Sequence, residues 1–173
     1  NKDKIALIED MVRGIVRELM APMLEAGTLD VYKLTSRTAL FTNAIFMGLE
    51  REEILHIRSL IDVYFQREPG VRGTTEKGQQ AFNEVHAYIM DLIKRYRKNP
   101  PPEHTHIGTW LRAEMAEGPL TEDQLFFNIF AMVITGSDTV PLTTAASVRF
   151  LDLHPDQLAQ VRADPELIPG VFE

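Results

Sequence analysis

The segment from about Glu122 to Leu151 predicts one long helix, and this element constrains the fold more than any other part of the chain. Apolar residues recur along it at helical spacing, and Thr121 and Gln124 have the form of a capping box at its start. At 1.5 Å per residue the helix would span roughly 45 Å. We expect it to be mostly buried, because its apolar residues need other elements packed against them.

One stretch of this helix breaks the pattern of a buried element. The run from Ile134 to Thr139 contains an acid, two threonines, a serine and a glycine, and Pro141 follows shortly after it. Local violations of this kind are expected where function overrides stability. The run is therefore the first candidate for a functional site.

The rest of the chain also has helical periodicity, without a convincing alternating strand pattern. Glycines such as Gly27 and Gly48 end helices, and a stretch of prolines ends another. We predict helices at about residues 5–24, 31–47, 50–66, 75–98, 109–116 and 155–163, and a further one that begins at Asp164. The expected fold class is all-α. The chain begins without Met and stops at Glu173 within a helical-looking segment, so we expect a piece of a longer protein.

Composition excludes several functions. The net charge of −7 and the pI of about 5.3 argue against a nucleic-acid partner, because phosphate binding needs a basic surface. No stretch approaches the ~18 consecutive apolar residues of a membrane span, so we expect no membrane partner. The absence of cysteine excludes disulfides and thiolate sites within these residues, and it fits a cytoplasmic location.

The polar run has a geometry of its own if the helix continues through it. Thr135 and Thr139 lie one turn apart on the same face, so the Thr139 hydroxyl can bond to the Thr135 carbonyl. Gly136 lets a ligand approach the backbone, and Pro141 removes a helical hydrogen bond. We therefore predict a distorted turn at about 135–139 that faces a cavity, with Asp138 supplying protons through water. The alternative is a kinked core helix in which Asp138 pairs with an arginine, and helix geometry alone leaves both open.

Several stretches together resemble one known family. Thr135-Gly136-Ser137-Asp138-Thr139 resembles the oxygen-activation motif of cytochrome P-450 monooxygenases, (Ala/Gly)-Gly-x-(Asp/Glu)-Thr. The residues at 47–53 and 120–125 resemble the junctions of soluble bacterial members, and those at 150–169 resemble the approach to the family's Glu-x-x-Arg helix. The resemblance implies that residues 1–173 are the helical core of a single cytochrome P-450 domain, truncated at both ends and containing its long oxygen-activating helix.

The resemblance assigns roles to the polar run. Thr139 would hydrogen-bond the bound dioxygen or its water, and Asp138 would be the acid of the proton relay. Gly136 would open the groove beside the cofactor. Thr135 stands where the family usually has Ala or Gly, so it would add bulk and a hydroxyl over the oxygen site.

Substrate contacts are expected from two places. Ala131, Ile134 and Thr135 share the helical face that leads to Thr139, so they are predicted to line the pocket. By the same resemblance, Tyr64 and Phe65 match the lid region over it. Ordinary core or loop packing is the alternative for both aromatic residues.

Two arginines are candidate partners of Asp138. Arg58 and Arg67 lie on the third helix and at its exit, and either could gate the relay; pairing with Glu50 or Glu68 is the plainer alternative. Glu50, Glu52 and Glu53 are interpreted only as a charged helix start that favours the helix dipole.

The resemblance also shows what these residues lack. The family's haem is held by a cysteine thiolate in a later loop, and this chain has no cysteine, so the ligand would lie outside it. By register, Glu173 is the residue just before the glutamate of Glu-x-x-Arg. We expect no separate metal site, because His104 and His106 lack a clear third ligand.

Two hypotheses follow. In the first, the chain is part of a monooxygenase that, when intact, inserts one oxygen atom from O2 into an apolar small molecule. It would use haem and electrons from a ferredoxin-type or flavin donor, and the fragment alone would be inactive. In the second, the chain is a non-catalytic truncated helical module that binds an apolar ligand or a protein partner.

Overall fold

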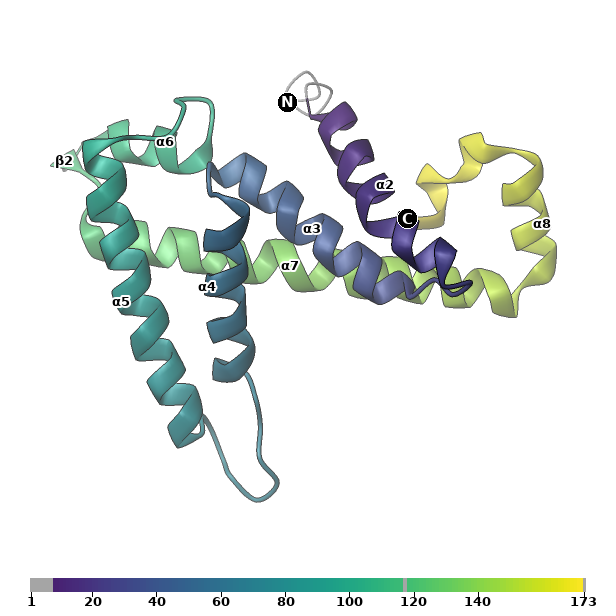
Figure 1. The fold of residues 1–173 in the computed structure, drawn as a ribbon, viewed down its shortest axis with the longest axis horizontal. Helices are drawn as coiled ribbons and strands as arrows, with labels where there is room; N and C mark the ends of the chain where they lie inside the picture. Colours follow the sequence, from purple (N-terminus) through teal and green to yellow (C-terminus); the bar gives the residue numbers. More distant parts are fainter. Residues whose placement is uncertain (1–7, 117, 173) are drawn as a thin grey trace. The chain divides into compact units, whose positions relative to one another are not determined.

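The computed structural model describes residues 8–116 and 118–172, and helices make up most of them (Figure 1). The α-helices are α2 (Glu9–Glu25), α3 (Val31–Met47), α4 (Arg51–Tyr64), α5 (Glu76–Lys98), α6 (His106–Arg112), α7 (Glu122–Leu153) and α8 (Pro155–Ala163). Strands β1 (Glu114–Met115) and β2 (Gly118–Pro119) pair antiparallel, and two short 3-10 helices follow α8, η1 (Pro165–Leu167) and η2 (Pro169–Phe172). The all-α prediction is confirmed for the described residues.

Most predicted helix ends agree with the structure because they depend on local signals. Gly48 follows α3 with a φ of 80°, and Gly27 lies just beyond α2 with a φ of 70°, conformations that favour glycine. Thr75 caps α5 by accepting a hydrogen bond from the Gly78 N–H at 3.0 Å. The predicted helix start at Ile5 and the register of Glu173 lie outside the described residues.

The short helix predicted near residues 109–116 is wrongly placed. α6 begins at His106, because the Thr105 hydroxyl accepts a hydrogen bond from the Gly108 N–H at 3.1 Å and caps the helix three residues earlier than expected. Glu114 and Met115 belong to the strand β1 instead. The element that begins after Asp164 is a single 3-10 turn, capped by the Asp164 side chain.

α7 is one uninterrupted helix of 32 residues that includes Pro141. Its start is the predicted capping box: Gln124 Oε1 accepts from the Thr121 N–H at 2.9 Å, and Thr121 Oγ1 accepts from the Gln124 N–H at 3.2 Å. The predicted distorted turn at 135–139 does not interrupt the helix. By length and composition α7 could also cross a membrane, but the core helix of a soluble protein meets the same criterion, so this is weak evidence.

The chain forms two compact units, one of residues 40–136 and the other of residues 1–39 together with 137–173. Most of the buried apolar side chains belong to residues 40–136. Within this unit α4 and α5 lie side by side as an antiparallel pair (Figure 1). The side chains of Ile57, Ile61, Val85 and Ile89 are completely buried, and each contributes roughly 1.5–3 kcal/mol by its removal from water. That all 173 residues belong to a single domain stays a prediction.

A buried carboxylate joins the start of α4 to the end of α5. Glu53 is only 8% exposed, and it accepts hydrogen bonds from Arg95 Nη1 at 3.1 Å, from the Tyr96 hydroxyl, and from the Glu50 N–H at 3.0 Å. Burial and the contact with Glu53 raise the pKa of the Tyr96 hydroxyl. The interpretation of Glu53 as nothing more than part of a charged helix start is therefore wrong, since its carboxylate also connects two helices.

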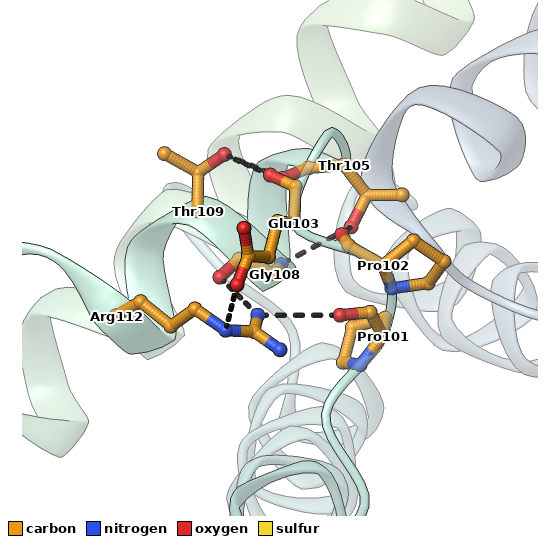
Figure 2. A network of polar contacts seen from close by, with 7 residues as sticks. All are labelled: Pro101, Pro102, Glu103, Thr105, Gly108, Thr109 and Arg112. Atoms are coloured by element: carbon orange, nitrogen blue, oxygen red, sulfur yellow. Dashed lines mark hydrogen bonds and ion pairs between the residues drawn. The ribbon is translucent and has the colours of Figure 1, made fainter.

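The connection from α5 to α6 is held by a compact set of polar contacts (Figure 2). Arg112 Nη1 donates to the Pro101 carbonyl at 3.3 Å and to the Gly108 carbonyl at 2.7 Å, while its Nε lies 3.3 Å from Glu103 Oε1. A Cβ at Gly108 would lie 2.1 Å from the Pro102 carbonyl oxygen, so only glycine fits there. In the same region, His106 stacks on the ring of Trp110 with a centroid distance of 5.7 Å.

Candidate functional site

The polar run lies in the middle of α7, and part of it belongs to an exposed face of this helix. Ala131, Thr135 and Thr139 follow one another at intervals of four residues and are all exposed; we call them the open face of α7. The Thr135 hydroxyl donates to the Ala131 carbonyl at 2.9 Å. We predicted such a backbone bond for Thr139, but within the described part of the chain it is Thr135 that makes it.

The opposite side of the same turn is buried. Ser137 is 2% exposed, and Val133 is completely covered. Ile134 and Asp138 are half-buried, between the two sides. The helix therefore presents its hydroxyls at 135 and 139 outward while the neighbouring residues anchor it.

Gly136 has a packing partner, Asn43, that helical spacing alone does not indicate. The ideal Cβ position at Gly136 lies 2.6 Å from Nδ2 of Asn43 and 2.9 Å from its Cγ, so the Asn43 amide occupies the space that a side chain would need. The Asn43 Nδ2 also donates to the Met132 carbonyl at 2.8 Å. The sequence signal for this contact is the amide of Asn43, which stands among apolar residues near the end of α3. The role of Gly136 beside a cofactor stays a prediction.

The two candidate arginine partners of Asp138 have other contacts. Arg58 forms an ion pair with Asp62, one turn later on α4, at 2.7 Å. Arg67 donates to the carbonyls of Tyr64 and Gln66. Pairing of either arginine with Asp138 stays a prediction. The alternative partners Glu50 and Glu68 take no part in the contacts given above for Arg58 and Arg67.

Of the two aromatic residues predicted over the pocket, only one is exposed. The Tyr64 ring packs against Phe82 with a centroid distance of 5.3 Å and against Phe130 at 6.2 Å, within an aromatic cluster of the 40–136 unit. Phe65 is 43% exposed, with the Arg67 guanidinium 5.9 Å from its ring centroid. The packing of Tyr64 matches the alternative of a core role, and substrate contact by either residue stays a prediction.

Two cavities lie away from the polar run. A cavity of about 530 Å³ is lined by residues of α7, α8, η1 and η2, among them Phe150, Gln157 and Leu167. A smaller one of about 210 Å³ lies between α4 and α5. Neither of these two, as formed by the described residues, includes a residue of the polar run.

Comparison with known proteins agrees with the motif. No protein-family model matches the chain. A cytochrome P-450 of Mycobacterium tuberculosis is 28% identical over 167 residues, which cover 96% of this chain and 41% of the relative. The mycinamicin VIII C21 methyl hydroxylase of Micromonospora griseorubida is 25% identical over 166 residues, covering 96% of this chain and 40% of that enzyme.

Solved structures show the same fold. The cytochrome P-450 PksS of the bacillaene polyketide synthase of Bacillus subtilis matches with a TM-score of 0.82 and 21% identity, covering 97% of this chain and 42% of that one. The helices and their order are thus those of the cytochrome P-450 fold. The chain is similar to cytochromes P-450 over nearly its whole length and corresponds to a part of such a protein. It spans about two fifths of the length of the curated relatives it matches.

The haem that this family implies can be compared with the residues present. The open face of α7 is exposed and carries two hydroxyls, which suits a wall beside a haem. The 173 residues contain no cysteine and so do not supply the thiolate that holds the iron in this family. The open face is therefore compatible with a wall beside the haem, whose iron ligand would come from outside these residues.

Proposed function

We propose that the intact protein is a cytochrome P-450 monooxygenase, which inserts one oxygen atom from O2 into an apolar small molecule. The other oxygen atom leaves as water, so the reaction consumes electrons and protons. The observation that carries the proposal is the run from Thr135 to Thr139 in α7, whose two threonines lie on the open face, in a chain that matches cytochromes P-450 over 96% of its length. Among the relatives, the names of a mycinamicin hydroxylase and a cyclomarin C epoxidase describe oxygen insertion.

The chain's own residues would handle protons. When bound, the haem supplies the redox chemistry of O2. The exposed Thr139 hydroxyl would donate a hydrogen bond to O2 or to the water beside it. The Asp138 carboxylate would pass protons to the same place through water. Thr135 is a weaker candidate for this task, because its hydroxyl already donates to the Ala131 carbonyl.

The remaining site residues would shape the pocket. Ala131 and Thr135 on the open face, with Ile134 beside them, would line the substrate pocket, and Thr135 and Gly136 would also contact the haem. Phe65 is the better of the two aromatic candidates for substrate contact, because Tyr64 is held in the core cluster. We expect a cytoplasmic protein that takes electrons from a ferredoxin-type or flavin donor.

The first experiment is the reduced carbon-monoxide difference spectrum of the full-length protein. A haem-thiolate band supports the proposal. A full-length product without haem would refute it and would favour the alternative of a helical module that binds an apolar ligand or a protein partner.

The second experiment tests the role of Thr139 within that enzyme. In Thr139→Ala we expect product formed per O2 consumed to fall about tenfold or more, the scale of a lost proton-transfer group, with substrate affinity little changed. Thr144→Ala is the matched control, because the Thr144 hydroxyl donates to the Val140 carbonyl of its own helix at 2.9 Å. Equal coupling in both variants would remove Thr139 from the mechanism.

A further inference from the structure

Asn43 is a buried amide with a single described hydrogen-bond partner, and that partner is a carbonyl of another helix. Its side chain comes from the last turns of α3 and is 6% exposed. Because a carbonyl oxygen only accepts, the group that meets the Met132 carbonyl at 2.8 Å must be the amide nitrogen. A buried amide without a partner would be costly, so this bond has to persist for Asn43 to stay buried.

The bond falls on a carbonyl that the helix already uses. In an α-helix the carbonyl of residue 132 accepts from the N–H of residue 136, so Met132 receives a second donor from outside the helix. A backbone carbonyl oxygen has two lone pairs, so it can accept both donors, and the Asn43 side chain then ties this turn to α3. The second donor acts on the turn that directly precedes Asp138 and Thr139.

Glycine at position 136 and asparagine at position 43 depend on each other sterically. A methyl group at 136 would approach the Asn43 amide to 2.6 Å, which is closer than van der Waals contact allows. The Asn43 amide therefore fills the space beside Gly136. The same amide also binds the carbonyl of Met132, one helical turn before Gly136. Two contacts from one side chain fix both the distance and the rotation of this turn relative to α3.

We infer that Asn43 is a positioning residue for the part of the site that would handle O2 and protons. It holds the turn 132–136 of α7 so that Thr135 and the residues after it are correctly oriented. This inference rests on the proposed monooxygenase function. Asn43 touches only the buried side of the turn, so it acts through the helix and not on the substrate.

The experiment compares Asn43→Leu in the full-length protein with Thr38→Val. Leucine has the same branched arrangement of four side-chain heavy atoms as asparagine, with bulkier ends, but it cannot donate to Met132. Thr38→Val removes a hydroxyl of α3 that donates to the Leu34 carbonyl at 2.9 Å, so it controls for the loss of a hydrogen bond elsewhere on the same helix. Asn43→Ala serves as a second variant if leucine prevents folding.

Amide hydrogen exchange of the segment 132–139 is the first readout, and it does not require activity. In Asn43→Leu we expect exchange in this segment to become about fivefold faster or more, the change expected from one lost hydrogen bond of ordinary strength. Product formed per O2 consumed should fall severalfold while substrate affinity is largely kept. The control should change neither quantity.

A double substitution tests the steric dependence directly. Gly136→Ala should lower the thermal midpoint by several degrees in the parent protein, and by less than half as much in the Asn43→Ala background, since the colliding amide is gone. Additive effects would overturn the claim that Asn43 and Gly136 act together.

Failure of the inference can be told from failure of the proposed function. A normal carbon-monoxide spectrum with unchanged exchange and unchanged coupling in Asn43→Leu overturns the role of Asn43 alone. Faster exchange with unchanged coupling shows that Asn43 is merely structural and also overturns the inference. A parent protein without a haem-thiolate spectrum overturns the proposed function, and the inference with it.

Discussion

Removal of the Glu53 carboxylate should be among the most destabilising single changes on α4. This side chain is buried and accepts from Tyr96 and Arg95 of α5, and from the Glu50 N–H at the start of its own helix. Glu53→Ala leaves all of these donors without their acceptor. The Tyr96 hydroxyl is affected most, because it is half-buried and faces the lost carboxylate.

The size of the effect can be built from these contacts. The hydrogen bond from Tyr96 to a charged acceptor contributes about 1.5–3 kcal/mol. The Arg95 side chain is 49% exposed, so solvent screens its ion pair with Glu53 and this pair adds only about 0–1 kcal/mol. Loss of the capping contact with Glu50 costs about 0.5–1 kcal/mol more. We therefore expect Glu53→Ala to lower the free energy of unfolding by about 3 kcal/mol, and Glu53→Gln by roughly half of that because it keeps one acceptor.

Urea unfolding of the full-length protein, followed by circular dichroism, measures this difference. Glu52→Ala is the matched control, since Glu52 is an exposed neighbour in the same helical turn, and it should change stability by less than about 0.5 kcal/mol. A double-mutant cycle with Tyr96→Phe should give a coupling energy of about 1 kcal/mol or more. If Glu53→Ala costs no more than Glu52→Ala, the buried carboxylate does not hold α4 to α5 and the reasoning is refuted.

Three further predictions concern the same unit. The pKa of Tyr96 is raised above its ordinary value of 10.0, so the stability that it contributes is present below about pH 10 and is lost as the pH rises further; urea unfolding between pH 9 and pH 11 should show a smaller decline in Tyr96→Phe. Gly108→Ala should cost about 1–3 kcal/mol in the same unfolding assay, because the new methyl group meets the Pro102 carbonyl backbone at 2.1 Å, and an unchanged midpoint would contradict the close contact. Phe65→Ala should weaken substrate binding in a spectral titration with little loss of stability, whereas Tyr64→Ala should destabilise the core by about 2–4 kcal/mol; the reverse pattern would exchange their roles.

Helix positions were largely predictable because their signals are local. The apolar spacing of residues 31–47 followed by Gly48 predicts α3, and the capping box at Thr121 predicts the start of α7. α6 was misplaced because the capping residue Thr105 stands in a proline-rich connection whose geometry depends on contacts with Pro102 and Arg112. Those contacts form only once the connection is folded.

The sequence by itself determined the helical class, the order of the helices and the run from Thr135 to Thr139, because each depends on residues within a few positions of one another. Only the tertiary structure decided which buried polar groups meet. Asn43 bonds to the Met132 carbonyl, which is 89 positions away along the chain. Glu53 bonds to Arg95 and Tyr96, which are 42 and 43 positions away. Burial of an amide or a carboxylate is tolerable only when a partner is brought to it, and helical periodicity says nothing about that partner. The face of α7 that carries Thr139 is thus readable from the sequence, whereas the contact that holds the turn before it is a property of the fold.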